Sequence, residues 1–157
     1  MAVDQVRING IAHSWGSCKL KIAGERVRGI LSVSYSDKLE TAFGYGMGRD
    51  HKPRSQSRGK YSAEPIAMKA TKSTAQEIRE MLARRSDGTS YGTVMVPIVL
   101  QYLEPDDKPI TVEFEDCRLV ENSASDEEGP DELTEELKWT TFGIRRNGLA
   151  LYNGDDR

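Results

Sequence analysis

The sequence has few of the residues that build metal sites and disulfide frameworks. It contains 2 cysteines, Cys18 and Cys117, and 2 histidines, His13 and His51, which stand in unrelated contexts. Two cysteines cannot form a disulfide scaffold, and these four residues do not have the spacing of zinc ligands. We therefore expect no metal site. Both cysteines lie in alternating patterns typical of buried, inert thiols, with an inter-subunit disulfide as the alternative.

Long apolar segments and aromatic residues are scarce as well. No segment approaches the roughly 18 apolar residues of a membrane-spanning helix, and residues 1–7 lack the apolar region of a signal peptide. We therefore expect no membrane association and no secretory signal. Aromatic residues make up 7% of the chain, which is too few for the aromatic platforms of a glycosidase cleft or of a nucleic-acid stacking site.

Motifs for catalysis are absent from the sequence. The glycines between Gly44 and Gly48 lack the further glycine and the following helix of a dinucleotide-binding loop, and no Walker motif occurs. Carboxylates are abundant, but without aromatic platforms they are typical of solvated faces rather than of a catalytic pair. We therefore expect no enzymatic activity, no catalytic residue and no cofactor.

Charge is distributed unevenly along the chain, although the net charge is only −3. Residues 1–72 contain 13 Lys and Arg against 6 Asp and Glu, whereas residues 73–157 contain 9 against 19. Two interpretations are open at this point. Either the two halves interleave into an evenly mixed surface, or oppositely charged surfaces meet between copies of the protein.

Alternation of apolar and polar residues predicts strands over most of the chain. A hairpin with an Asn9–Gly10 turn is expected first, followed by strands at Cys18–Ile22 and over residues 27–33, with Gly29 marking a bulge. A later strand is expected over residues 94–102, in which the missing N–H of Pro97 indicates an edge position or a bulge.

The last part of the chain also predicts strands. The apolar pattern of residues 110–119 changes phase near Glu115–Asp116, which predicts a one-residue bulge. A final strand is expected over residues 133–139, and the chain from Asn147 onward is expected to fray.

One helix is predicted, from Ser73 to Arg85. A capping box that begins at Ser73 or Thr74 is expected at its start, and Arg84 and Arg85 suit the negative end of its dipole. The apolar residues at helical spacing predict a face that packs on a sheet: Ala75, Ile78, Met81 and Leu82.

Between Leu39 and Tyr61 the chain has almost no residues to bury. Residues 44–60 are rich in glycine and basic residues, and a connection of this length inside a compact domain is commonly functional. The segment predicts an extended arm that becomes ordered against a partner. The whole pattern predicts a mainly β fold, a sandwich or partly closed barrel with one flanking helix. We expect one domain over residues 1–157, with an arm at about 40–61, a helix at about 73–85 and a frayed tail at about 150–157.

The charged segments suggest a contact between copies. The cations of the arm have no aromatic platform between them, so the acidic surface of a neighbouring copy is a better partner than nucleic acid. These cations are Arg49, Lys52, Arg54, Arg58 and Lys60. Acidic strand faces are expected at Thr111, Glu113 and Glu115 and at Glu132, Thr134 and Glu136. Such a face repels phosphate, so it suits a surface along which DNA slides without binding.

A set of short segments along nearly the whole chain carries a family pattern in its order and spacing. They are Val6–Gly10, Trp15, Gly29–Ile30, Tyr35–Glu40, Tyr45–Arg49, Pro53, Arg58–Tyr61, Cys117–Arg118 and Ile144–Leu149. Together they resemble the tail tube proteins of tailed bacteriophages, in particular of contractile-tailed phages, with a more distant similarity to secretion-tube proteins. Asp50–His51–Lys52 before Pro53 departs from this pattern.

The resemblance implies a barrel-like subunit with one helix, which assembles into hexameric rings that stack into a hollow tube for DNA. It implies a virion protein made in the host cytoplasm, with sheath, baseplate, tail terminator and tape-measure proteins as partners. The family's long hairpin contributes to contacts between rings, and it maps onto the arm, with Tyr45, Arg49, Arg54, Arg58 and Lys60 as contact residues. Glu113, Glu115, Glu132 and Glu136 become candidates for an acidic lumen or interface.

Other functions remain open from the sequence. Within the same machinery the chain fits a tube initiator, a tube terminator or a ring protein of a secretion tube. In a different class, it fits a small β-rich module that binds nucleic acid through the basic arm, although a pI near 5.5 disfavours this interpretation.

Overall fold

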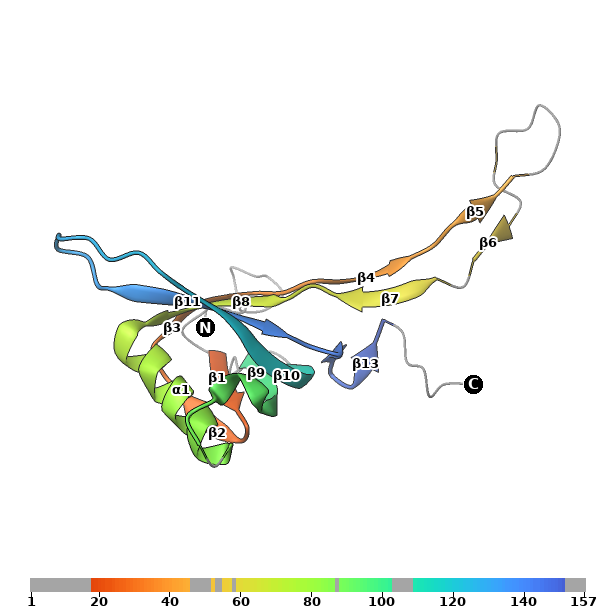
Figure 1. Ribbon diagram of the computed structural model, residues 1–157. Helices are drawn as coiled ribbons and strands as arrows, with labels where there is room; N and C mark the ends of the chain where they lie inside the picture. Colours follow the sequence, from red (N-terminus) through yellow and green to blue (C-terminus); the bar gives the residue numbers. More distant parts are fainter. Residues whose placement is uncertain are drawn as a thin grey trace, which may run out of the picture.

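The computed structural model describes residues 18–45, 52, 55–57, 59–86, 88–102 and 109–151 (Figure 1). The hairpin expected around Asn9–Gly10 lies outside these ranges, as do Arg49, Arg54 and Arg58 of the expected arm.

One antiparallel sheet forms the body of the protein. Its strands pair in the order β2-β1-β9-β10-β11-β8-β3, and β12 joins β10 and β13 beside this path. The strands are Cys18–Ile22 (β1), Glu25–Val27 (β2), Ile30–Ser34 (β3), Ile66–Thr71 (β8), Met95–Tyr102 (β9), Ile110–Ala124 (β10), Thr134–Thr140 (β11), Gly143–Arg146 (β12) and Leu149–Ala150 (β13). The mainly β fold is therefore confirmed. Within the described ranges the pairing runs from β2 to β3 without closing into a barrel.

A bulge in β10 explains the change of hydrophobic phase, as predicted. Phe114 pairs with Ile98 and Cys117 pairs with Val96, so β10 carries one extra residue at this point, and Asp116 there has a φ of 45°. Because of the bulge, the apolar residues before it and those after it all face the core. The buried residues of this strand are Val112, Phe114, Cys117 and Leu119.

Pro97 lies opposite this bulge and in a central strand, so the edge alternative was wrong. β9 pairs with β1 on one side and with β10 on the other. The carbonyl of Pro97 accepts a hydrogen bond from Ala23 N–H at 2.8 Å, just where β1 ends. Proline has no N–H, so residue 97 cannot donate a hydrogen bond back to the Ala23 carbonyl. This carbonyl accepts from Arg85 Nη2 at 3.3 Å instead.

The helix α1 (Lys72–Arg85) packs its apolar face against the sheet. The expected face is confirmed, because Ala75, Ile78, Met81 and Leu82 are all buried. The expected capping box was wrong, since the N-cap is Thr71, whose hydroxyl accepts from Thr74 N–H at 3.4 Å. Thr71 is also the last residue of β8, so the strand passes directly into the helix. A short 3₁₀ helix, η2 (Tyr91–Thr93), follows α1.

Gly29 joins β2 to β3 with a φ of 88° rather than forming the bulge, whose register shift falls at Ile30–Ser32. A Cβ at this position would lie 2.2 Å from Thr74 Oγ1, which donates to the carbonyl of Arg28. Gly29 therefore lets the chain pass closely under the start of α1.

Replacing Gly29 with alanine is expected to destabilise the fold more than the same change at Gly24. Gly24 has a similar φ of 85°, but a Cβ added there would have no atom within 4 Å. Both variants carry the cost of a positive φ, about 1–2 kcal/mol, and only Gly29→Ala adds the clash with Thr74. Urea unfolding of the two variants measures the difference, and equal midpoints would contradict the close approach.

Residues 147–150, which were expected to fray, form a turn and a short strand instead, and residues 152–157 of the expected frayed tail lie outside the described residues. Asn147 and Gly148 have φ values of 54° and 80°, which build the tight turn between β12 and β13. Asn147 Oδ1 accepts from Thr111 N–H at 2.7 Å and fastens this turn to β10. Asn-Gly is a strong hairpin signal, so the turn was readable in the sequence.

Candidate assembly interface

The expected arm is an extended hairpin that leaves the body of the protein (Figure 1). Its stem pairs β4 (Asp37–Glu40) with β7 (Lys60–Ala63), and a second ladder pairs β5 (Phe43–Gly44) with β6 (Ser55–Gln56). Both ladders are separate two-stranded sheets. A two-stranded ribbon is marginally stable alone in water, so this arm is suited to a partner that covers it.

Two of the predicted contact residues lie within the described part of the arm, and both are exposed. Tyr45 is 65% exposed, its neighbour Phe43 is 51% exposed, and Lys60 is also exposed. Lys60 faces Glu40 across the stem. The remaining predicted contacts, Arg49, Arg54 and Arg58, lie outside the described residues.

The stem itself carries charges of both signs. Lys38 Nζ lies 3.1 Å from Glu40 Oε1 and 3.8 Å from Glu64 Oε1. The hydrogen bond to Glu40 and the nearby carboxylates raise the pKa of Lys38, although the pair is exposed to solvent. The excess of cations in the arm therefore comes from residues beyond the stem.

The two acidic faces predicted from the sequence lie far apart in the structure. Glu113 is exposed in β10 opposite Arg145, whereas Glu136 in β11 lies opposite Ser123, which is roughly 30 Å further along β10. Glu115 accepts a hydrogen bond from Arg145, and Glu132 is exposed in the loop before β11. Basic neighbours therefore interrupt the expected acidic faces.

An acidic loop lies at the end of the molecule that is opposite the arm (Figure 1). The ends of β10 and β11 project beyond the body, and the connection at residues 125–133 is exposed throughout. Lys72 Nζ binds Asp126 Oδ2 at 2.6 Å, which fastens the loop to the start of α1. The other acidic residues of the loop are Glu127, Glu128, Asp131 and Glu132.

Ion pairs within one subunit balance part of the charge asymmetry, and a contact between copies stays a prediction. The ion pairs Lys72–Asp126 and Arg146–Asp37 join the basic and acidic halves of the chain within one subunit. In contrast, Lys21 and Arg26 lie directly opposite each other in β1 and β2, and such like charges destabilise a sheet. Sequence reasoning had assigned the cationic excess to the arm and missed this second position.

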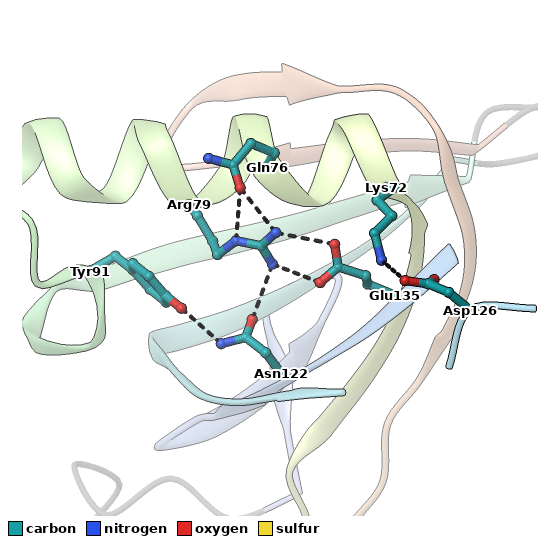
Figure 2. A network of polar contacts seen from close by, with 7 residues as sticks. All are labelled: Lys72, Gln76, Arg79, Tyr91, Asn122, Asp126 and Glu135. Carbon is teal, nitrogen blue, oxygen red and sulfur yellow. Dashed lines mark hydrogen bonds and ion pairs between the residues drawn. The ribbon is translucent and has the colours of Figure 1, made fainter. Parts of the chain in front are cut away.

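A buried ion pair fastens α1 to the β10–β11 hairpin (Figure 2). Arg79 donates from Nη1 and Nη2 to the two oxygens of Glu135, both at 3.1 Å, and the side chains are only 16% and 9% exposed. Arg79 also donates to Gln76 and Asn122, and Asn122 donates to Tyr91. Sequence reasoning missed this network, although Glu135 alternates in phase with the core residues of β11.

The two cysteines are free thiols in different environments. Cys18 is half-buried in β1, whereas Cys117 is fully buried behind the bulge. Cys117 Sγ donates to the carbonyl of Phe114 at 3.5 Å, and burial raises the pKa of this thiol to about 12. The expectation of a buried thiol is therefore confirmed for Cys117.

We expect the unfolding free energy to fall as the pH rises from 9 to 12, with Cys117 contributing about 1.4 kcal/mol per pH unit. In the unfolded chain the thiol ionises near its ordinary pKa of 9.0, whereas the folded protein keeps the proton until about 12. The stabilisation is complete below pH 9. Denaturant titrations of the wild type and Cys117→Ala between pH 8.5 and 10.5 give the unfolding free energy of each protein against pH. The wild type should lose stability more steeply than the variant, and equal slopes would contradict the prediction.

Among the described residues, no group of three or more histidine, cysteine, aspartate or glutamate side chains is placed to hold a metal ion. His13 and His51 lie outside these residues. None of the helices seen in the described ranges combines the length and apolar character needed to span a membrane.

Neither a family model nor a curated protein matches the sequence. Solved structures match the fold over most of the chain. A chain of the anti-feeding prophage (AFP) baseplate has a TM-score of 0.64 at 13% identity, covering 90% of this chain and 97% of that chain. A chain of the PVC sheath–tube complex, from an extracellular contractile injection system in the extended state, has a TM-score of 0.64 at 10% identity, with coverage of 93% and 97%. Hcp1 from Flavobacterium johnsoniae has a TM-score of 0.55 at 18% identity, with coverage of 87% and 98%.

The protein therefore shares its fold with chains of contractile injection systems and with Hcp1, in agreement with the resemblance in its sequence. The match extends over nearly the full length of each of these chains. At these low identities the similarity establishes the fold, and the function is argued from the surface of this chain.

Proposed function

We propose that the protein is a structural virion protein that forms the stacked hexameric rings of a phage tail tube, a conduit for DNA during ejection. The observation that carries this proposal is the arm, a two-stranded ribbon whose aromatic side chains Phe43 and Tyr45 are exposed. These side chains bury little within their own subunit. The similarity to a chain of a sheath–tube complex supports the proposal, because a stack of rings would supply a neighbour for every arm.

Charge complementarity supports a contact between the arm of one subunit and the acidic loop of residues 125–133 in the next ring. The two features lie at opposite ends of the molecule (Figure 1). A contact between different surfaces of identical subunits is heterologous, and its repetition builds a ring or an open filament. In this arrangement Arg49, Arg54, Arg58 and Lys60 pair with carboxylates between Asp126 and Asp131.

For the lumen we propose that exposed carboxylates discourage DNA from binding, since like charges repel phosphate. Glu113 and Glu136 are the candidates in strands, because both are exposed on the face of the sheet that is turned away from the core. Glu115 is a weaker candidate because Arg145 neutralises it, and Glu132 in the acidic loop fits an inter-ring contact better.

Partners beyond the tube itself follow from the same proposal. The similar chains belong to a baseplate, a sheath–tube complex and a tube-terminating cap. By analogy, this protein would meet a sheath, a baseplate, a terminator and a tape-measure protein in the virion, after synthesis in the host cytoplasm. It would act without a catalytic step or a cofactor.

Negative-stain electron microscopy of the purified protein tests the proposal. Hollow tubes or hexameric rings are expected, and a persistent monomer at all concentrations would contradict it. Growth of long tubes identifies a repeating tube subunit, whereas single rings identify an initiator or terminator. DNA binding by a monomer with a steep dependence on salt would instead favour a nucleic-acid-binding module.

A further inference from the structure

The arm meets the body at a joint where the regular backbone hydrogen bonding between the two strands is interrupted. The chain segments of β3 and β8 continue outward as β4 and β7, but the two ladders are separate sheets. Between them, Glu64 N–H donates to the carbonyl of Ser36 at 2.9 Å, and the next residue, Pro65, has no N–H to donate. A ribbon interrupted in this way can pivot unless side chains hold it.

Strand β12 binds the arm beyond this joint through one backbone N–H and one side chain. Tyr61 Oη in β7 donates to Asp37 Oδ2 in β4 at 3.0 Å and accepts from the Ile144 N–H at 3.1 Å. Arg146 Nη1 lies 3.3 Å from the other carboxylate oxygen of Asp37, whose side chain is only 6% exposed. Both strands of the stem are thereby bound to β12. Burial raises the pKa of Tyr61 above its ordinary value.

The body side of this contact is itself anchored in the core. The Arg146 guanidinium lies 5.7 Å from the ring centroid of Tyr35, and Tyr35 packs edge-on against Phe114 with centroids 5.0 Å apart. The hydroxyl of Tyr35 lies 3.2 Å from that of Tyr102 in β9. A cation held over an aromatic ring and bound to a buried carboxylate has little freedom to move.

We propose that Asp37, Tyr61 and Arg146 form a clasp that holds the arm in one direction relative to the body and so prepares it to meet a neighbouring subunit. The second half of this statement rests on the proposed function. A ribbon that pivots loses more conformational freedom when it docks, and preorganisation removes that cost. The three residues act as positioning residues, since their side chains contact one another where the stem meets β12 and do not reach the exposed tip of the arm.

Hydrogen exchange of the full-length chain, below the concentration at which it assembles, tests the clasp directly. Tyr61→Phe keeps the ring and removes both hydrogen bonds of the hydroxyl. We expect amides of the β4–β7 ladder to exchange at least about tenfold faster, because the variant loses a hydrogen bond to the Asp37 carboxylate together with the bond from the Ile144 N–H. Amides of β8, β9 and β11 should keep the wild-type rates.

Tyr91→Phe is the matched control, because it removes a tyrosine hydroxyl that accepts from Asn122 Nδ2 at 3.0 Å in the body. This variant should leave the exchange of the stem unchanged. Wild-type exchange in the stem of Tyr61→Phe, or equal acceleration in both variants, would overturn the clasp.

Sedimentation of assembled material tests the consequence for assembly. The critical concentration of Tyr61→Phe is expected to rise about tenfold above that of the wild type and of Tyr91→Phe. Faster exchange with an unchanged critical concentration would overturn the link to assembly. If the wild type itself never assembles, the proposed function fails, and the exchange rates alone decide whether the clasp exists.

Discussion

Deleting residues 44–58 is expected to give a folded subunit that no longer forms tubes. The deletion joins Phe43 to Gly59 and leaves a four-residue connection between Glu40 and Lys60, which already pair at the end of the stem. Connections of this length are common in hairpins. The thermal midpoint should stay close to that of the wild type, because none of the removed residues that the structure describes (44, 45, 52 and 55–57) belongs to the buried core.

Assembly depends on the removed residues in the proposed tube, so pelleting and electron microscopy should detect no tubes even at tenfold the wild-type critical concentration. A full-length control with Arg49, Arg54, Arg58 and Lys60 changed to glutamine separates charge from contact area. This control should assemble weakly and lose most of its dependence on salt. Normal tubes from the deletion variant would contradict the role of the arm.

Replacing Arg79 with methionine is expected to destabilise the subunit by about 3–5 kcal/mol, because Glu135 then stays buried without its partner. For a chain of this size the thermal midpoint would fall by roughly 10 °C. Arg79 and Glu135 hold α1 to the hairpin that carries the acidic loop (Figure 2). Calorimetry or denaturant unfolding measures the loss.

Two further variants show whether the loss comes from the uncompensated charge. Arg84→Met changes an exposed arginine of the same helix and should cost less than about 1 kcal/mol. The double variant Arg79→Met with Glu135→Leu removes both charges and should recover most of the stability. Equal losses in Arg79→Met and Arg84→Met would show that the pair does not act as a buried ion pair.

Much of the fold was readable in the sequence because strands and helices are recorded in short-range periodicity. The alternation in β1 and β10 and the helical spacing of Ile78 and Met81 predicted which side chains are buried. The phase change at Glu115–Asp116 located the bulge. Even the arm followed from local composition, since a segment with nothing to bury cannot lie inside the body.

The errors occurred where a residue's role depends on a distant partner. Pro97 is tolerated in a central strand because β1 ends beside it and Arg85 satisfies the Ala23 carbonyl. The helix begins after Thr71 because β8 ends at that residue. Ser73 and Thr74 fit a capping box locally, but the end of β8 places Thr71 at the cap.

The candidate interface divides in the same way. By itself, the sequence determined the composition of the arm and the excess of acidic residues in the later half. It also determined the order and spacing of the short segments that resemble tail tube proteins. The tertiary structure decided that the arm and the acidic loop lie at opposite ends, that Glu113 and Glu136 are far apart, and that Arg146 reaches Asp37 across 109 residues. The reason is physical: periodicity records which face a side chain takes, but contacts between distant residues exist only once the strands have paired.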